Sequence, residues 1–224
     1  MTAVNPRPAL TAFLGGDPGS ESGSSWRSRL VAQAAELTRS GGWQAITMAK
    51  LADRVGVSRQ TVYNEIGSKQ QLAEAMIMHE LEIFLQAVDT AFEEHPDDLG
   101  EAIRTASTKV LELARTNPLL HAVLSASHGA ESALLPLLTT QVDPLIEAAH
   151  GLVRRHLRNY EHGLDEDRID PLVDMVIRLV LSHVTAPSTS PTETADNIAW
   201  IAQRVLESAG RAQPTDDEAR GKNA

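Results

Sequence analysis

Residues 47–69, TMAKLADRVGVSRQTVYNEIGSK, predict two short helices joined by a glycine turn. Gly56 stands where the chain must turn sharply, and glycine adopts a positive φ without steric cost. Ser58 offers an N-cap oxygen for the second helix, in which Val62 and Ile66 lie one turn apart and form an apolar face. A helix, a glycine turn and a capped second helix are typical of a helix-turn-helix, and this motif decides the fold class.

The polar face of the second helix carries side chains suited to contacting DNA. Arginine can fork onto guanine, and glutamine or asparagine can pair with adenine in the major groove, while a tyrosine hydroxyl can contact phosphate. Arg59, Gln60, Tyr63 and Asn64 project from this face. We therefore expect a DNA-binding helix; the alternative is a helical hairpin whose polar side chains are only solvated.

Helix starts on both sides of this polar face add sites for phosphate. Thr47 and Ser68 each stand where a helix begins, so their hydroxyls and the free backbone N–H groups behind them suit phosphate oxygens. Ser68 and Gln71 form an S-x-x-Q capping box, which marks the start of a third helix, and Lys69 adds a positive charge there.

Motifs on both sides of the hairpin occur in a fixed order: an apolar helix face, a Gly-Gly-Trp turn, and the residues of the hairpin itself. They are Leu30, Ala34 and Leu37, then Gly41-Gly42-Trp43, Ile46-Thr47, Val57-Ser58-Arg59, Val62-Tyr63, Gly67-Ser68-Lys69 and Leu72. In this order and spacing, the stretch from about Trp26 to Leu72 resembles the TetR (AcrR) family of bacterial transcription regulators. The chain departs from the family's usual pattern at two positions. Asn64 stands where the family often has histidine, which leaves the base preference open. Ile66 stands where the family often has phenylalanine, which is a conservative change in the core.

The resemblance implies an all-α protein, with an N-terminal three-helix helix-turn-helix domain joined to a larger helical ligand-binding and dimerisation domain. It also implies a homodimer that binds a palindromic operator in double-stranded DNA, usually as a repressor, and is released by a small-molecule effector. Activation stays open. The DNA contacts that the resemblance implies are Thr47, Ser58, Arg59, Gln60, Thr61, Tyr63, Asn64 and Lys69.

Charge is distributed unevenly along the chain. The 224 residues carry a net charge of −10, yet residues 25–70 hold seven basic and three acidic side chains, a net +4, which leaves −14 for the rest. A basic end facing phosphate and an acidic body facing away orient a protein on DNA. The modest positive charge also favours a dimer, because two copies double the phosphate contacts. For the acidic body we adopt the simpler interpretation, that its negative charge serves solubility.

Composition and motifs exclude several other classes of protein. The chain has no cysteine, which excludes disulfides and zinc–thiolate sites. No run approaches the roughly 20 apolar residues that span a bilayer, so we expect a cytoplasmic protein without membrane contact. His79-Glu80 lacks the second histidine of a zinc-protease helix, and no nucleophile elbow, phosphate-binding glycine loop or paired-carboxylate motif occurs. We therefore expect no enzyme activity, cofactor or metal.

The chain is expected to have four parts. Residues 1–24, rich in Gly, Pro and Ser, predict a flexible arm, and residues 210–224 predict a flexible tail. Residues 25–72 form the expected DNA-binding domain, and residues 73–209 the expected effector-binding and dimerisation domain. Helical periodicity runs through the latter. Pro136 and Pro144 are expected to divide or kink one of its helices, and Asp143-Pro144 is the expected restart if the helix is divided.

The helix expected from about Asp167 to Thr185 is apolar around most of its circumference, whereas one core face needs only about 100°. The surplus favours a second buried face against another subunit; the alternative is a helix buried within one chain. In the resembling family the last two helices form a four-helix bundle with their twins. The expected dimer interface comprises Leu172, Val176, Val180, Ile198, Ile201 and Val205.

The resemblance also implies an effector pocket among the central helices. Its candidate lining is aliphatic and poor in aromatic residues, which favours an acyl or alkyl chain over a flat, multi-ring compound; the alternative is plain core. Two other functions stay open, an effector-independent DNA-binding protein and a helical enzyme or carrier. The candidate lining residues are Ile103, Val110, Leu120, Leu124, Leu138, Ile146, Met175 and Leu179.

Overall fold

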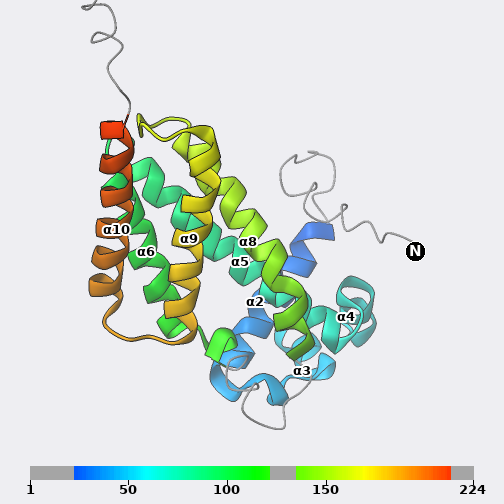
Figure 1. The fold of residues 1–224 in the computed structure, drawn as a ribbon. Coiled ribbons are helices and arrows are strands. Elements are labelled where there is room, and N and C mark those ends of the chain that lie inside the picture. Colours follow the sequence, from blue (N-terminus) through cyan, green and yellow to red (C-terminus); the bar gives the residue numbers. More distant parts are fainter. Residues whose placement is uncertain (1–22, 122–134, 213–224) are drawn as a thin grey trace, which may run out of the picture. The chain divides into compact units, whose positions relative to one another are not determined.

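The computed structural model describes residues 23–121 and 135–212, and every regular element in these ranges is a helix (Figure 1). The all-α class is therefore confirmed. Most of the expected arm and tail lie outside the described residues. Contacts divide the chain into an N-terminal unit, Met1–Met76, and a C-terminal unit, Ile77–Ala224. Within the described ranges, no helix has the length and apolar character that crossing a membrane requires.

The N-terminal unit consists of short helices around a common apolar core. In chain order they are α2 (Gly23–Gly41), the 3-10 helix η1 (Trp43–Ala45), α3 (Met48–Val55), α4 (Arg59–Ile66) and the start of α5 (Lys69–Glu94). Apolar residues spaced three or four apart place one face of each longer helix in the core. The fully buried side chains include Leu30, Ile46, Leu51, Val62, Leu72 and Met76.

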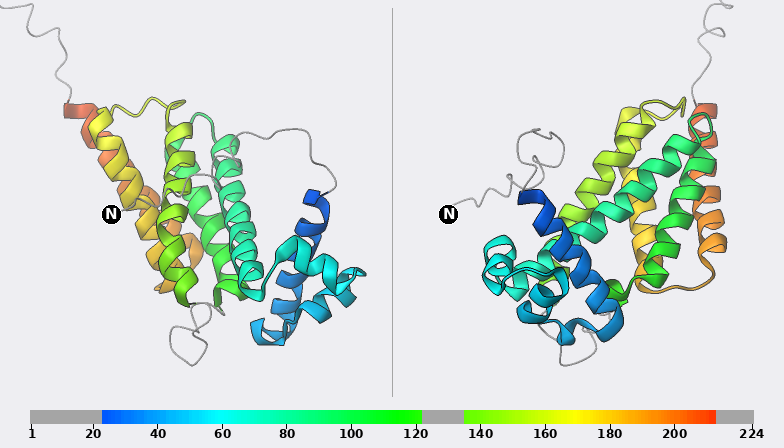
Figure 2. Two further views of the ribbon diagram at one scale, coloured as in Figure 1. Left: turned by 90° about the vertical axis from the view of Figure 1, so that its right-hand side faces the viewer. Right: turned by 180° about the vertical axis from the view of Figure 1, so that it is seen from behind.

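The C-terminal unit is a bundle of longer helices (Figure 2). It contains the rest of α5, then α6 (Leu99–Thr116), α8 (Leu135–Leu157), α9 (Glu166–Thr185) and α10 (Pro191–Ala212). Residues 118–121 are also helical, and Asn117 caps them by accepting a hydrogen bond from the Leu120 N–H at 2.9 Å. Of the two expectations for Pro144, division and restart of the helix are wrong, because α8 continues through Pro144. Leu145, Ala148 and Ala149, which follow Pro144, pack against Leu81 and Leu85 of α5, and such packing offsets the backbone hydrogen bond that proline cannot make.

Small side chains allow α6 and α10 to approach closely. α10 packs mainly against α6, and the buried contact between them includes Ala102, Ala106, Ala199 and Ala202. At Gly100 a Cβ atom would lie only 1.8 Å from the Gln203 side chain. Ile103 and Ile198 fill the remaining space, so this seam is built from alanines and a glycine with few large residues.

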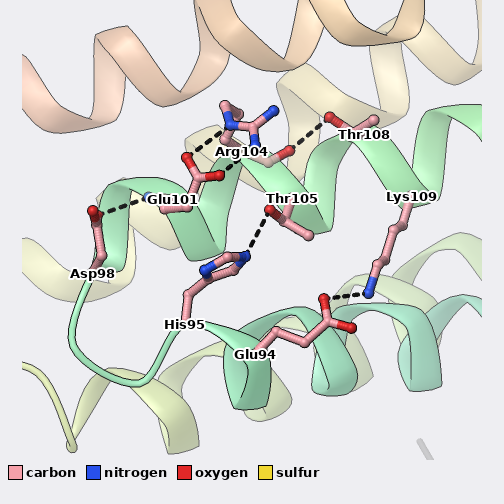
Figure 3. A network of polar contacts seen from close by, with 8 residues as sticks. All are labelled: Glu94, His95, Asp98, Glu101, Arg104, Thr105, Thr108 and Lys109. Atoms are coloured by element: carbon pink, nitrogen blue, oxygen red, sulfur yellow. Dashed lines mark hydrogen bonds and ion pairs between the residues drawn. The ribbon is translucent and has the colours of Figure 1, made fainter.

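A polar network ties the end of α5 to the start of α6 (Figure 3). Asp98 caps α6 by accepting a hydrogen bond from the Glu101 N–H at 2.9 Å. The Glu101 carboxylate in turn accepts from Arg104, and this hydrogen bond holds the pKa of Glu101 below its usual value. Two contacts cross between the helices: His95 with Thr105 at 3.1 Å and Lys109 with Glu94 at 2.6 Å.

Tyr160 joins the segment after α8 to the end of α5. Its hydroxyl donates to the backbone carbonyls of His95 and Phe92, at 2.7 and 3.2 Å, and its ring meets the Phe92 ring edge-on. Burial raises the pKa of Tyr160, because the interior favours the neutral phenol.

We expect Tyr160→Phe to lower the free energy of unfolding by about 1–2 kcal/mol, because two partly buried carbonyls lose their donor. Urea denaturation measures this loss. Tyr63→Phe, at an exposed hydroxyl, is the matched control and should leave stability unchanged. Equal stability of Tyr160→Phe and the unmodified protein would show that water replaces this hydroxyl without cost.

Candidate nucleic-acid interface and effector cavity

The turn between α3 and α4 depends on one left-handed residue. Gly56 has φ 76° and ψ 36°, and the Gly56 and Val57 N–H groups both donate to the Ala52 carbonyl, at 2.9 and 3.0 Å. A Cβ at Gly56 would meet no atom within 4 Å, so glycine is required here by backbone conformation and not by crowding. The turn ends α3 and sets the direction in which α4 begins.

Capping and burial fix the orientation of α4. The Ser58 hydroxyl accepts a hydrogen bond from the Thr61 N–H at 3.0 Å and lies 2.9 Å from the Thr61 hydroxyl. Val62 and Ile66 are buried against the rest of the unit. Arg27 donates to the Glu65 carbonyl at 2.8 Å and so ties α2 to the last turn of α4. The polar face of α4 is therefore directed away from the core of its own unit.

The exposed face of α4 presents three predicted base-reading residues together with Tyr63, a predicted phosphate contact. Arg59, Gln60, Tyr63 and Asn64 are all exposed, and the Tyr63 side chain is 52% accessible. The Gln60 amide donates to the Asn64 carbonyl at 2.9 Å. This bond leaves the Gln60 oxygen as an acceptor and the Asn64 N–H groups as donors, side by side on the helix surface. Such a face has the donors and acceptors needed to contact base edges.

The remaining predicted DNA contacts surround this face. Thr47 caps α3 by accepting from the Lys50 N–H at 3.1 Å, and its own O–H remains available as a donor. The expected capping box is confirmed, since Ser68 and Gln71 exchange hydrogen bonds of 2.9 and 3.2 Å. The Lys69 ammonium lies 4.8 Å from the centroid of the Trp43 ring, a cation–π contact that positions its charge.

Sequence reasoning missed that several basic side chains serve the fold of this unit. Besides Arg27, Lys50 donates to the Ala45 carbonyl at 3.0 Å, and Arg54 donates to Gln33 at 3.4 Å. The Arg27 and Arg54 contacts join residues 38 and 21 positions apart, so no local pattern could identify them. Net charge alone therefore overstates the number of cations whose only role would be to contact phosphate.

We expect Gly56→Ala to destabilise the N-terminal unit by about 1–2 kcal/mol, the cost of a left-handed conformation for an L-residue. The control is Gly151→Ala in α8, where φ is not positive and a Cβ also meets nothing within 4 Å. That change should be neutral or stabilise by up to about 1 kcal/mol, because alanine favours helix. Urea denaturation compares the two, and equal effects would contradict a conformational requirement at Gly56.

An apolar cavity of about 380 Å³ lies within the C-terminal unit. Side chains from α5, α6, α8, α9 and α10 line it, and Ile103, Val110 and Leu120 of the expected set are among them. Ile146 and Leu179 lie outside the lining, and Met175 is exposed. Leu124 and the side chain of Leu138 fall outside the described residues.

Sequence reasoning missed the contribution of α5 to this cavity. One stripe of α5 faces it, at a spacing of three or four residues, and includes two phenylalanines. Apolar periodicity shows that one face of α5 is buried, but it does not distinguish a face that lines a cavity from one that packs in a solid core. The lining residues from α5 are Ile77, Glu80, Leu81, Phe84, Leu85, Val88 and Phe92.

The residues expected at a dimer interface fall into three groups. Leu172, Val176 and Val180 line the cavity, and Ile198 is buried against α6. Ile201 and Val205 are exposed on α10, beside the exposed Trp200. Met175 is the exposed apolar residue of α9.

The fold and the exposed polar face of α4 together define a helix-turn-helix protein with a second, helical unit. The family described as bacterial regulatory proteins, tetR family, matches residues 30–76, and that described as Bacterial Tetracyclin repressor, C-terminal domain, matches residues 98–204. The chain belongs to the TetR family of DNA-binding transcriptional regulators.

Relatives and solved structures agree with this assignment. The HTH-type transcriptional regulator AlkX of Mycobacterium tuberculosis is 27% identical over 174 residues, which cover 78% of this chain and 81% of AlkX. Nucleoid occlusion factor SlmA of Vibrio cholerae is 30% identical over 155 residues, covering 67% and 75% of the two chains. The crystal structure of the TetR family repressor AlkX from a Dietzia strain, implicated in biodegradation of n-alkanes, superposes with a TM-score of 0.66 at 25% identity, covering 81% of this chain and 97% of that one.

Proposed function

We propose that this protein is a dimeric repressor that binds a palindromic operator through α4 and is released by a small, mainly apolar effector with an alkyl or acyl chain. The observation that carries the DNA-binding part is the exposed face of α4, where four polar side chains project opposite buried Val62 and Ile66. In this proposal, Arg59, Gln60 and Asn64 contact base edges in the major groove.

The proposed phosphate contacts come from the residues around that face. Tyr63 offers its exposed hydroxyl, Thr47 and Ser68 offer cap hydroxyls at two helix starts, and Lys69 offers its charge. Ser58 and Thr61, which share the cap of α4, belong to the same set. These contacts position the helix without reading sequence.

We expect Gln60→Ala to reduce discrimination at one base pair by about 1–3 kcal/mol and leave the other positions unchanged, because a single side chain reads that base. Tyr63→Phe should weaken binding to all sequences alike, since it removes a phosphate contact. DNA fragments retained by the purified protein supply the operator, and quantitative gel shifts on its single-base variants measure both effects. Gln86→Ala, at an exposed glutamine of the other unit, is the control. Unchanged specificity in Gln60→Ala would contradict base contact by this residue.

Support for a dimer comes from the apolar surface of the last two helices. Of the seven large hydrophobic side chains that are exposed in the described part of the chain, four lie on α9 and α10. They are Met175, Trp200, Ile201 and Val205, with exposed fractions of 60, 58, 41 and 39%. Exposed apolar surface of this kind favours association. A two-fold dimer places two recognition helices about one DNA turn apart, which a palindromic operator matches.

We expect Ile201→Glu to yield monomers and to weaken operator binding at least about 10-fold, because a buried, unpaired carboxylate opposes association. Light scattering gives the mass, and gel shifts give the affinity. Met78→Glu is the control, since Met78 is equally exposed but lies on α5. A dimer of unchanged stability in Ile201→Glu would place the interface elsewhere.

Support for an apolar effector comes from the cavity in the C-terminal unit. Its volume of about 380 Å³ lies within the range of ligand sites, about 300–1,000 Å³, and aliphatic side chains dominate its lining. A Dietzia relative is implicated in the biodegradation of n-alkanes, which agrees with an alkyl or acyl ligand. The effector must bind the DNA-incompetent state more tightly, and a coupling of about 1–3 kcal/mol reduces DNA affinity about 5- to 150-fold.

A second candidate function is DNA binding without an effector. The nucleoid occlusion factor among the relatives favours it, because that name describes no ligand-controlled regulator. Gel shifts with and without straight-chain amphiphiles distinguish the two candidates: release supports the repressor, and DNA binding unaffected by every chain tested supports the alternative. Salt-dependent DNA binding in either case opposes the third possibility, a helical enzyme or carrier.

A further inference from the structure

One charged side chain lines the apolar cavity among the described residues, and it belongs to Glu80 on α5. Its partner is Asn117, which follows the end of α6 and is buried, with 8% of its surface exposed. The Asn117 Nδ2 donates to Glu80 Oε2 at 2.6 Å. Apart from the hydroxyls of Ser107 and Thr185, the rest of the lining is apolar, so the cavity contains a single carboxylate–amide pair.

The backbone fixes which way the Asn117 amide faces. Its Oδ1 accepts from the Leu120 N–H at 2.9 Å, so its NH₂ group is the part that faces Glu80. Glu80 is consequently held in place by one donor, while an ionised carboxylate accepts hydrogen bonds at both oxygens. Within the described ranges, Asn117 is the hydrogen-bond partner of Glu80. Any further hydrogen bond to the ionised carboxylate must be one that it accepts. A ligand group placed against Glu80 must therefore be a donor.

The cavity also has the length for an extended chain. Both Glu80 and Phe92 line it from the same helix, and 12 residues of helix correspond to about 18 Å. Between them, Phe84 and Val88 continue the same stripe. The polar pair therefore lies toward one end of this stripe, and the α5 residues beyond it toward Phe92 are apolar.

We propose that the effector is a straight aliphatic chain ending in a hydroxyl, which donates its hydrogen to Glu80 while the methylenes fill the apolar part of the cavity. This assignment rests on the proposed apolar effector and specifies its head group. An alkanoate would place a second carboxylate beside Glu80, and like charges at such a site oppose binding. An alkane would displace water from Glu80 without replacing its hydrogen bonds, and an ammonium group would lose more hydration than a hydroxyl does.

Isothermal titration of the full-length protein, without DNA, compares 1-decanol with decanoate at neutral pH. We expect 1-decanol to bind at least about 10-fold more tightly, because its hydroxyl donates to Glu80 whereas decanoate places a like charge there. Glu80→Gln should reduce this preference to about 3-fold or less, mainly by admitting decanoate, since the amide removes the like charge. Glu82→Gln, on the same helix but outside the cavity lining, is the matched control and should keep the preference.

The outcomes separate this inference from the function on which it rests. Equal binding of 1-decanol and decanoate, or an unchanged preference in Glu80→Gln, overturns the hydroxyl assignment while an apolar effector stands. Failure of both compounds to bind the folded, DNA-binding protein overturns the apolar effector itself. Equal binding of the two ligands to the unmodified protein overturns the assignment even where Glu80→Gln does not fold.

Discussion

Burial of Val62 and Ile66 is the interaction on which the DNA-binding unit depends. The two side chains fill the core only if α4 leaves the turn in one direction, and the left-handed conformation of Gly56 sets that direction. When Val62 and Ile66 are buried and Gly56 directs the turn, the opposite face of the eight-residue helix α4 is necessarily exposed. No other residue is needed to expose it. The polar residues on it are free to vary with the DNA sequence, because the packing does not involve them.

The sequence predicted the N-terminal unit well because its signals are local. Glycine at a turn, a serine cap and an S-x-x-Q box each act within a few residues, and the structure contains all three at the expected positions. The contacts that escaped prediction are long-range. Arg27 bonds to a carbonyl 38 residues away, and Glu80 to an amide 37 residues away, and periodicity carries no information on such pairs.

The C-terminal unit shows the same limit in its apolar residues. Hydrophobic spacing identified α9 as apolar on more than one face, but could not say which residues face a cavity and which face solvent. Leu172, Val176 and Val180 have the same chemistry as Ile201 and Val205, yet the first three line the cavity and the other two are exposed. Pro144 shows the same limit. Its local signal predicts that the helix is divided, yet α8 continues through it in the folded protein.

The alanine-rich seam between α6 and α10 has a mechanical consequence. Short alanine side chains let the two helices pack closely and offer few alternative rotamers through which the seam could rearrange. The pair therefore forms a stiff wall of the cavity. We expect an occupant that enlarges the cavity to displace α5, α8 or α9, which supply most of the remaining lining.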